Sequence, residues 1–171
     1  MGMQVVEKGE IKVVGIPWSG TYTEINQLPF LFDEMKQRLR DVPYQTNEPI
    51  LIAPFHGRET ELTYYFTTPV SEIKEIPEGM VGFTIPRKFY VCTTHSGRQD
   101  EIRHTYQQLF NWMKEYGYEQ DFHALSLEVF HDVYSLLDES GSRFFDIYVP
   151  LKTYNRHIDQ DLHFQSTFFS V

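Results

Sequence analysis

"LFDEMK" at residues 31–36 and "LFNWMK" at residues 109–114 are identical at four of six positions, although they lie 78 residues apart. Each block belongs to a segment whose apolar residues recur at steps of three and four. The first segment runs from Ile25 to Val42, and the second runs from Ile102 to Tyr116. This spacing is typical of an amphipathic helix with one apolar stripe. We therefore expect two similar helices, one in each half of the chain.

The blocks that flank the two helices also resemble each other and follow in the same order. A β-rich run ending in Ser-Gly precedes each helix, a strand containing Phe-His follows it, and a further strand then closes on Pro. These pairs are "VVGIPWSG" and "YVCTTHSG", "ILIAPFHG" and "LSLEVFHD", and "ELTYYFTTPV" and "RFFDIYVPLK". Four matching blocks in one order indicate an internal duplication.

Each half is therefore predicted to be a strand–helix–strand–strand unit, which gives an α+β fold. Two such units in tandem would form an antiparallel sheet with pseudo-twofold symmetry and a cleft between the repeats. Repeat one covers about residues 8–75 and repeat two about 80–152, within a single domain spanning 1–171. The tail, residues 153–171, has no counterpart in the first half. We expect it to complete the sheet or to pack on its outside.

Composition narrows the classes of function. A formal net charge of −9 argues against a protein that binds the phosphate backbone of nucleic acids. The single cysteine, Cys92, excludes an intramolecular disulfide framework, and the seven histidines show no metal-binding spacing. We expect no metal and no cofactor. No signal peptide and no long apolar run is visible, so a cytoplasmic protein is expected.

Glu128 is the unusual residue of the strand predicted at 125–130. Aliphatic residues occupy one face of this strand, and Glu128 shares the other face with Phe130. Its counterpart in the first half, 75 residues earlier, is Ala53. One interpretation is an ordinary glutamate that faces solvent on an edge strand. The other is a carboxylate placed among aromatic side chains to meet a cation or to transfer a proton.

The order and spacing of these blocks resemble those of the GyrI-like small-molecule-binding family, also called the AraC-type or transcription-activator effector-binding domain. The resemblance covers residues 8 to 152. It rests on the duplicated units, on Glu128-Val129-Phe130, on "DIYVPLK" at 146–152 and on the glycine-containing segment 93–97. It implies a domain that binds bulky cationic or amphipathic compounds between its repeats, with a buried glutamate facing the ligand. Phe130 stands where a tyrosine is usual, and the turn at 95–98 lacks the usual Pro-Tyr.

The candidate ligand-binding residues follow from that resemblance and from the strand patterns. Glu128 would be the charge anchor, and Tyr65, Tyr148 and Phe130 would be aromatic walls. In "ELTYYFTT" only one of the two tyrosines can line a given cleft, and Tyr65 is preferred because Tyr64 shares its face with Leu62 and Phe66. Trp18 and Tyr22 bracket the predicted Ser19-Gly20 turn and would cap the mouth of the cleft.

Three functions remain open at this point. The first is a stand-alone binding protein for an amphipathic or cationic small molecule, of the multidrug-binding type found in bacterial transcription regulators. The second is a hydrolase of cyclopropane-type or other reactive xenobiotic compounds, in which Glu128 would activate water and Tyr148 would assist. The third is an inhibitor that acts through a protein surface. We expect a small-molecule ligand, a possible protein partner, and no direct binding to nucleic acid or membrane.

Overall fold

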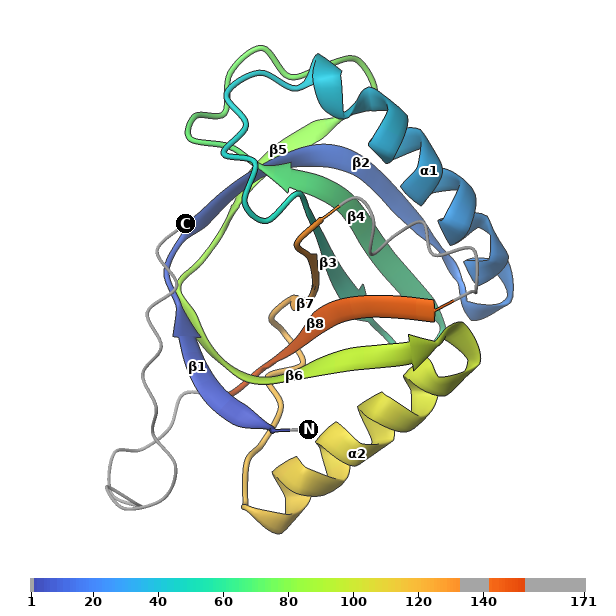
Figure 1. The fold of residues 1–171 in the computed structure, drawn as a ribbon, viewed down its shortest axis with the longest axis vertical. Helices are drawn as coiled ribbons and strands as arrows, with labels where there is room; N and C mark the ends of the chain where they lie inside the picture. Colours follow the sequence, from blue (N-terminus) through green and yellow to red (C-terminus); the bar gives the residue numbers. More distant parts are fainter. Residues whose placement is uncertain (1, 133–141, 153–171) are drawn as a thin grey trace.

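The computed structural model describes residues 2–132 and 142–152 of the 171-residue chain (Figure 1). It contains eight strands and two α-helices. In chain order they are β1 (Gln4–Lys8), β2 (Ile11–Thr21), α1 (Leu28–Arg38), β3 (Leu51–Gly57), β4 (Glu61–Pro69), β5 (Val81–Ile85), β6 (Lys88–Arg98), α2 (Ile102–Glu115), β7 (Ser126–Phe130) and β8 (Ser142–Pro150). Short 3-10 turns flank the helices: η1 (Tyr22–Gln27) precedes α1, η2 (Leu39–Asp41) follows it, and η3 (Gln99–Glu101) precedes α2.

The eight strands form one antiparallel sheet, which confirms the predicted α+β class. Their order across the sheet is β1-β6-β8-β7-β3-β4-β2-β5. If every strand of one half is exchanged for the equivalent strand of the other half, the same order is obtained, read from the opposite edge of the sheet. This symmetry places β3 and β7, the third elements of the two predicted repeats, side by side in the middle of the sheet.

The two edge strands, β1 and β5, were not anticipated. β5 lies in the segment that the sequence analysis treated as a linker. Each edge strand pairs with a strand of the opposite half, β1 with β6 and β5 with β2. Both edge strands contribute to one buried cluster, Val6 from β1 and Ile85 from β5. The sheet is therefore strongly curled, as Figure 1 shows.

Side chains alternate between the two faces of the curled sheet and form two cores. The outer face is covered by the helices: α1 buries Phe32 and Met35 against it, and α2 buries Leu109 and Met113. α1 packs on β2 and β4, whereas α2 packs on β6. The inner face carries a separate apolar cluster of Val6, Ile11, Val13, Ile52, Ile85, Tyr90, Cys92, Leu127, Val129 and Tyr148.

The Ser-Gly pairs before the helices are not turns, which corrects the sequence analysis. Ser19 and Gly20 lie within β2, and the ladder with β4 continues as far as Thr21. The segment 93–97 likewise lies within β6. The turn comes one residue after each glycine and is fixed by a glutamate. The Glu24 carboxylate accepts a hydrogen bond from the backbone N–H of Thr21 at 3.0 Å, and Glu101 does the same for Arg98 at 2.8 Å.

Two further expectations concern membranes and the tail. Within the described part of the chain, neither helix has the length and apolar character needed to cross a bilayer. The expectation for the tail, residues 153–171, falls outside the described residues. The assignment of 1–171 to a single domain stays a prediction.

Candidate functional site

Glu128 lies at the centre of the sheet on its outer, helix-covered face. Its register partners are Ala53 on β3 and Ile147 on β8, so β7 is an inner strand and not an edge. The side chain is partly buried. The edge-strand interpretation of this glutamate is therefore wrong, and the carboxylate must be stabilised by its neighbours.

Two tyrosine hydroxyls provide that stabilisation. Tyr106 of α2 donates a hydrogen bond to Oε1 of Glu128 at 2.6 Å, and Tyr64 of β4 donates a second bond to the same oxygen at 3.3 Å. Tyr64 comes from the first half of the chain, whereas Tyr106 and Glu128 come from the second. The carboxylate is therefore held jointly by both predicted repeats.

Aromatic rings hold both tyrosines in place. Phe55 of β3 stacks on Tyr64 with the ring centroids 4.9 Å apart, and it meets Tyr106 edge-on at 6.4 Å. Tyr64 also stacks on Phe66, with the ring centroids 5.6 Å apart, and Tyr106 stacks on Phe110, with the ring centroids 6.2 Å apart. The electron-rich faces of such rings attract organic cations. A carboxylate among them is a suitable site for a bulky, positively charged group.

The electrostatics of Glu128 reflect opposing effects. Burial raises the pKa of its carboxyl above the ordinary value, while the hydrogen bonds from Tyr106 and Tyr64 and the charge of Arg143 act to lower it. Burial and the nearby carboxylate raise the pKa of both tyrosine hydroxyls. Tyr64 and Tyr106 therefore remain protonated donors at neutral pH.

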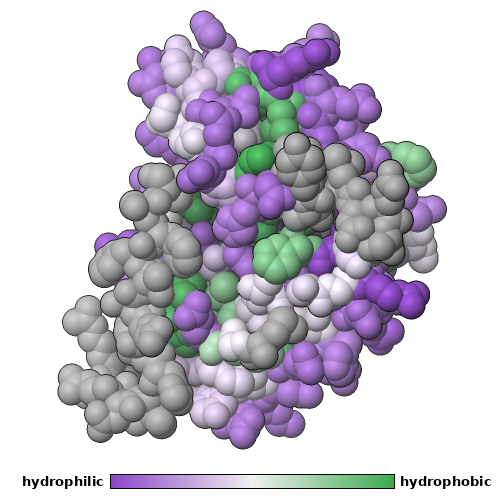
Figure 2. Space-filling view, in the orientation of Figure 1, coloured by the Kyte–Doolittle hydropathy of each residue, from purple (hydrophilic) through white to green (hydrophobic). Residues whose placement is uncertain are grey.

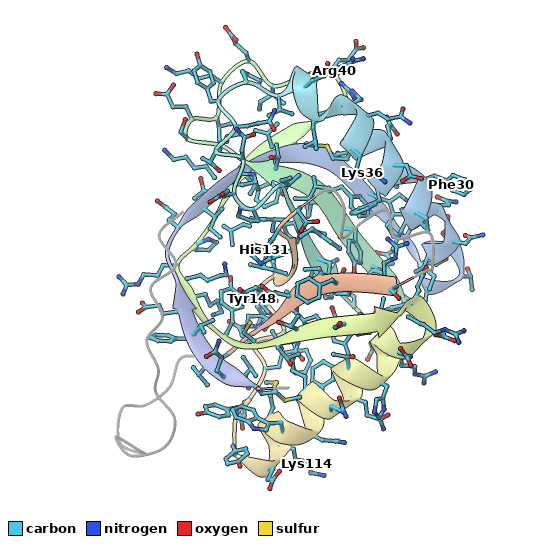
Figure 3. All side chains as sticks on the ribbon, viewed as in Figure 1. Phe30, Lys36, Arg40, Lys114, His131 and Tyr148 are labelled. Carbon is cyan, nitrogen blue, oxygen red and sulfur yellow. The ribbon has the colours of Figure 1, made fainter. Side chains whose placement is uncertain are left out.

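Two predicted neighbours of Glu128 lie on the opposite face of the sheet. Tyr65 packs on Phe83 of β5 at 4.8 Å, so it is Tyr64 and not Tyr65 that faces the carboxylate. Tyr148 belongs to the inner cluster, where its ring meets Tyr90 at 5.9 Å. Figure 3 shows Tyr148 within the ring of strands, away from the helices. These two placements were wrong because the registers of β4 and β8 against their neighbours cannot be read from each strand alone.

The other three predicted residues have partners of their own among the described residues. Phe130 shares the face of Glu128, but it is buried between Phe32 at 5.2 Å and Phe145 at 5.1 Å. Trp18 is the register partner of Tyr64 and donates from Nε1 to Gln27 at 3.1 Å. Tyr22 donates to the carbonyl oxygen of Arg58 at 2.7 Å. Ligand binding by these residues, and the cleft itself, stay predictions.

Tyr106, Tyr64 and Phe55 are the site residues that the sequence analysis missed. Tyr106 was counted only as part of the apolar stripe of its helix. A tyrosine in such a stripe carries a hydroxyl that needs a partner when it is buried. Glu128, on the predicted strand 125–130, is a carboxylate that also needs a partner. That requirement is the signal from which the pair could have been found.

The inner face of the sheet also carries a small cluster of polar residues, Asp146, Thr94 and His131. Asp146 accepts hydrogen bonds from the hydroxyl of Thr94 at 2.6 Å and pairs with Nε2 of His131, also at 2.6 Å. Figure 3 places His131 on the same side as Tyr148, and Figure 2 shows apolar surface in the middle of this view, inside a polar rim. Cys92 is buried and free, and burial raises its pKa to about 12, so its thiol is a poor nucleophile. No group of three potential metal ligands occurs among the described residues.

Solved structures of similar fold include binding proteins and an enzyme. SAV2435, whose structure was determined with bound tetraphenylphosphonium, is 12% identical with a TM-score of 0.70, and the match covers 89% of this chain and 94% of that one. EcmrR in a complex with DNA is 17% identical with a TM-score of 0.66, covering 90% of this chain and 58% of that one. A hydrolase from Listeria innocua is 12% identical with a TM-score of 0.54, covering 88% and 91%.

At these identities the similarity concerns the fold alone. Comparison with curated proteins finds no match. The family profile is more specific, because the GyrI-like small molecule binding domain matches residues 1–152. That range contains both helices, all eight strands and the Glu128 site. The chain therefore belongs to the GyrI-like small molecule binding domain family.

Proposed function

We propose that this protein binds a bulky organic cation, with Glu128 as the charge anchor and Tyr64, Tyr106 and Phe55 as aromatic walls. The observation that carries the proposal is the convergence of two tyrosine hydroxyls on one oxygen of a partly buried carboxylate. The arrangement keeps a negative charge available in an apolar surrounding, where the attraction of an organic cation is less weakened by water. Binding of this kind suits a cytoplasmic protein that sequesters amphipathic compounds or passes their presence to a protein partner.

Tetraphenylphosphonium is a suitable probe, since SAV2435 of similar fold was solved with it. Its charge is permanent, and tetraphenylborate has nearly the same shape with the opposite charge. We expect the wild type to bind the phosphonium in calorimetric titration and to bind the borate much more weakly. Glu128→Gln keeps an oxygen that can accept from both tyrosines but removes the charge. We expect it to lose at least tenfold in affinity for the phosphonium, or about 1.4 kcal/mol.

A matched control distinguishes the anchor from a general effect of charge. Glu115 lies in α2 and is exposed. Glu115→Gln removes the same charge from the surface and should leave the affinity for tetraphenylphosphonium unchanged. The proposal fails if both ions bind equally well, or if Glu128→Gln binds the phosphonium as tightly as the wild type does.

A hydrolase remains the second candidate, favoured by one observation. Burial raises the pKa of Glu128, and the hydroxyl of Tyr106 lies 2.6 Å from its carboxylate. A carboxylate of raised pKa is a better general base toward water, and a tyrosine hydroxyl can donate to a developing oxyanion. Tyr106 takes the role first expected of Tyr148. Turnover of a reactive electrophile that is lost in Glu128→Gln would support the enzyme, and its absence across cyclopropane and ester substrates would count against it.

A further inference from the structure

The two oxygens of the Glu128 carboxylate have different surroundings. Oε1 accepts hydrogen bonds from both Tyr106 and Tyr64. Among the residues that the structure describes, none donates a hydrogen bond to Oε2. A carboxyl oxygen that accepts two donated protons cannot also carry one of its own without losing a bond. A proton on Glu128 therefore belongs on Oε2.

Few charged groups face this carboxylate from the neighbouring elements. β4 presents Tyr64, and α2 presents Tyr106. β8 presents Arg143, whose positive charge favours the carboxylate. The facing residues of β3 are Ala53 and Phe55, which do not titrate.

Two other ionisable groups on the described elements of this face are already engaged. His95 on β6 is hydrogen-bonded to Thr105 and to the carbonyl of Arg98, and Lys36 of α1 is paired with Asp33. Within the described part of the chain, a cation that arrives at Oε2 therefore meets the Glu128 carboxyl, whose charge depends on whether the proton has left.

Resting on the cation-binding function proposed above, we propose that a proton and the cationic group of the ligand compete for Oε2 of Glu128, so that binding one cation releases one proton. Oε1 keeps both tyrosine bonds in either state. The exchange thus needs no rearrangement of Tyr64 or Tyr106. The aromatic walls contact the ligand in the same way at every pH. Only the electrostatic attraction between the cation and Glu128 changes.

The sign of the pH dependence follows from linkage. The neutral carboxyl is favoured below the raised pKa of the free site, and there the cation must displace the proton. The affinity for a permanent cation should therefore fall by about tenfold for each pH unit below that midpoint and become constant above it. For a neutral ligand of similar shape, the affinity should not vary in this way.

Calorimetry with tetraphenylphosphonium tests the exchange directly. Titrations at each pH in two buffers with different ionisation enthalpies count the protons released. We expect nearly one proton per cation below the midpoint and none well above it. Glu128→Gln should release none at any pH, and its weaker binding should not depend on pH. Glu115→Gln should behave as the wild type.

The outcomes separate this proposal from the one on which it rests. Tight binding by the wild type with constant affinity from pH 4 to 8 and no proton release would overturn the competition but leave cation binding intact. No binding at any pH would overturn both.

A second pair of variants excludes a merely structural role for the tyrosines. Tyr106→Phe removes the shorter hydrogen bond to Oε1 and leaves the ring. The loss of a bond that favours the carboxylate should raise the pKa of Glu128 and move the midpoint to higher pH. Tyr64→Phe should do the same to a smaller extent, because its bond is longer. A midpoint that stays in place in both variants would contradict the assignment of Oε1. Titration of the ¹³C-labelled glutamate carboxyls, with the Glu128 resonance identified by its loss in Glu128→Gln, reads the midpoint without any ligand.

Discussion

Ala53 and Glu128 are direct register partners across the central strands β3 and β7. They are also counterparts in the sequence, 75 residues apart, so equivalent positions of the two predicted repeats meet at the middle of the sheet. The surroundings differ accordingly. Glu128 receives two tyrosine hydroxyls, whereas Ala53 belongs to the apolar outer core, in which Phe32 contacts both Phe66 and Phe130. The central pair thus combines one polar residue with one apolar residue.

This asymmetry predicts that a carboxylate is tolerated on one strand only. Ala53→Glu would place a second negative charge beside Glu128, at a position that is 2% exposed and belongs to the apolar outer core. We expect a loss of about 3–5 kcal/mol in the free energy of unfolding, measured by urea denaturation at pH 7. Ala53→Gly controls for the backbone and should cost about 1 kcal/mol. Equal stability of Ala53→Glu and the wild type would show that this side also accommodates charge.

Glu128→Gln should make the protein more stable at neutral and alkaline pH. The pKa of Glu128 is raised in the folded state, so its contribution to stability is fully present below the ordinary value of 4.5 and is lost as the pH rises through the raised value. Glutamine imitates the neutral form at every pH. Urea unfolding between pH 4 and pH 8 should show a gain for the variant that grows with pH and disappears near pH 4. Glu115→Gln, which changes an exposed residue, should show no such trend. A gain in stability for Glu128→Gln that does not depend on pH would contradict the assignment of the gain to the raised pKa of Glu128.

We expect Phe130 to contribute to stability as a core residue. It is buried and packs against Phe32 and Phe145, so Phe130→Ala leaves a cavity and should cost about 3–5 kcal/mol in the free energy of unfolding. Phe30 is a matched control on α1, since its side chain is 76% exposed and points away from the sheet in Figure 3. Phe30→Ala should change stability by less than about 0.5 kcal/mol. If Phe130→Ala lost affinity for tetraphenylphosphonium without losing stability, Phe130 would be a wall after all.

The removal of two buried threonine hydroxyls, those of Thr105 and Thr93, should have different effects on stability. Oγ1 of Thr105 lies 2.7 Å from Nδ1 of His95, and Nε2 of His95 faces the carbonyl oxygen of Arg98. Because a carbonyl only accepts, Nε2 carries the ring proton and Thr105 donates to Nδ1. Thr105→Val would leave that nitrogen buried without a partner and should cost about 1–3 kcal/mol.

Thr93 provides the matched control for this substitution. Its buried Oγ1 has no hydrogen-bond partner within the described residues. Thr93→Val should therefore be neutral or stabilise the protein by about 1 kcal/mol, as measured by urea denaturation. A similar loss in both variants would mean that the bond between Thr105 and His95 is not what stabilises α2 on β6.

The sequence predicted the two helices and the six inner strands in their order along the chain, but not how the strands pair. The alternation around Glu128 placed it correctly on the face of Phe130. The choice between Tyr64 and Tyr65 failed because it depends on how β4 pairs with β3, where Phe55 opposes Tyr64. A shift of one residue in a register moves every side chain to the other face.

The edge strands were missed for a related physical reason. β1 and β5 pair with strands that belong to the opposite half of the chain. A short apolar segment does not indicate which distant strand it pairs with. Tyr106 was missed because its partner, Glu128, lies 22 residues away on a different element. Helical periodicity describes which face is apolar, and it does not distinguish a ring that fills a core from one that also delivers a hydroxyl.

The exchanged edge strands have a consequence for a chain cut within residues 71–79, between the halves. The first fragment would hold β1, which pairs with β6 of the second, and the second would hold β5, which pairs with β2 of the first. Each fragment would thus lend a strand to the other, and neither would contain both Glu128 and Tyr64. A ligand that needs both residues would favour reassembly by mass action, by about 2.7 kcal/mol at a hundred times its Kd. Fused to the two parts of a split reporter, the fragments would turn the presence of a small cation into an optical signal.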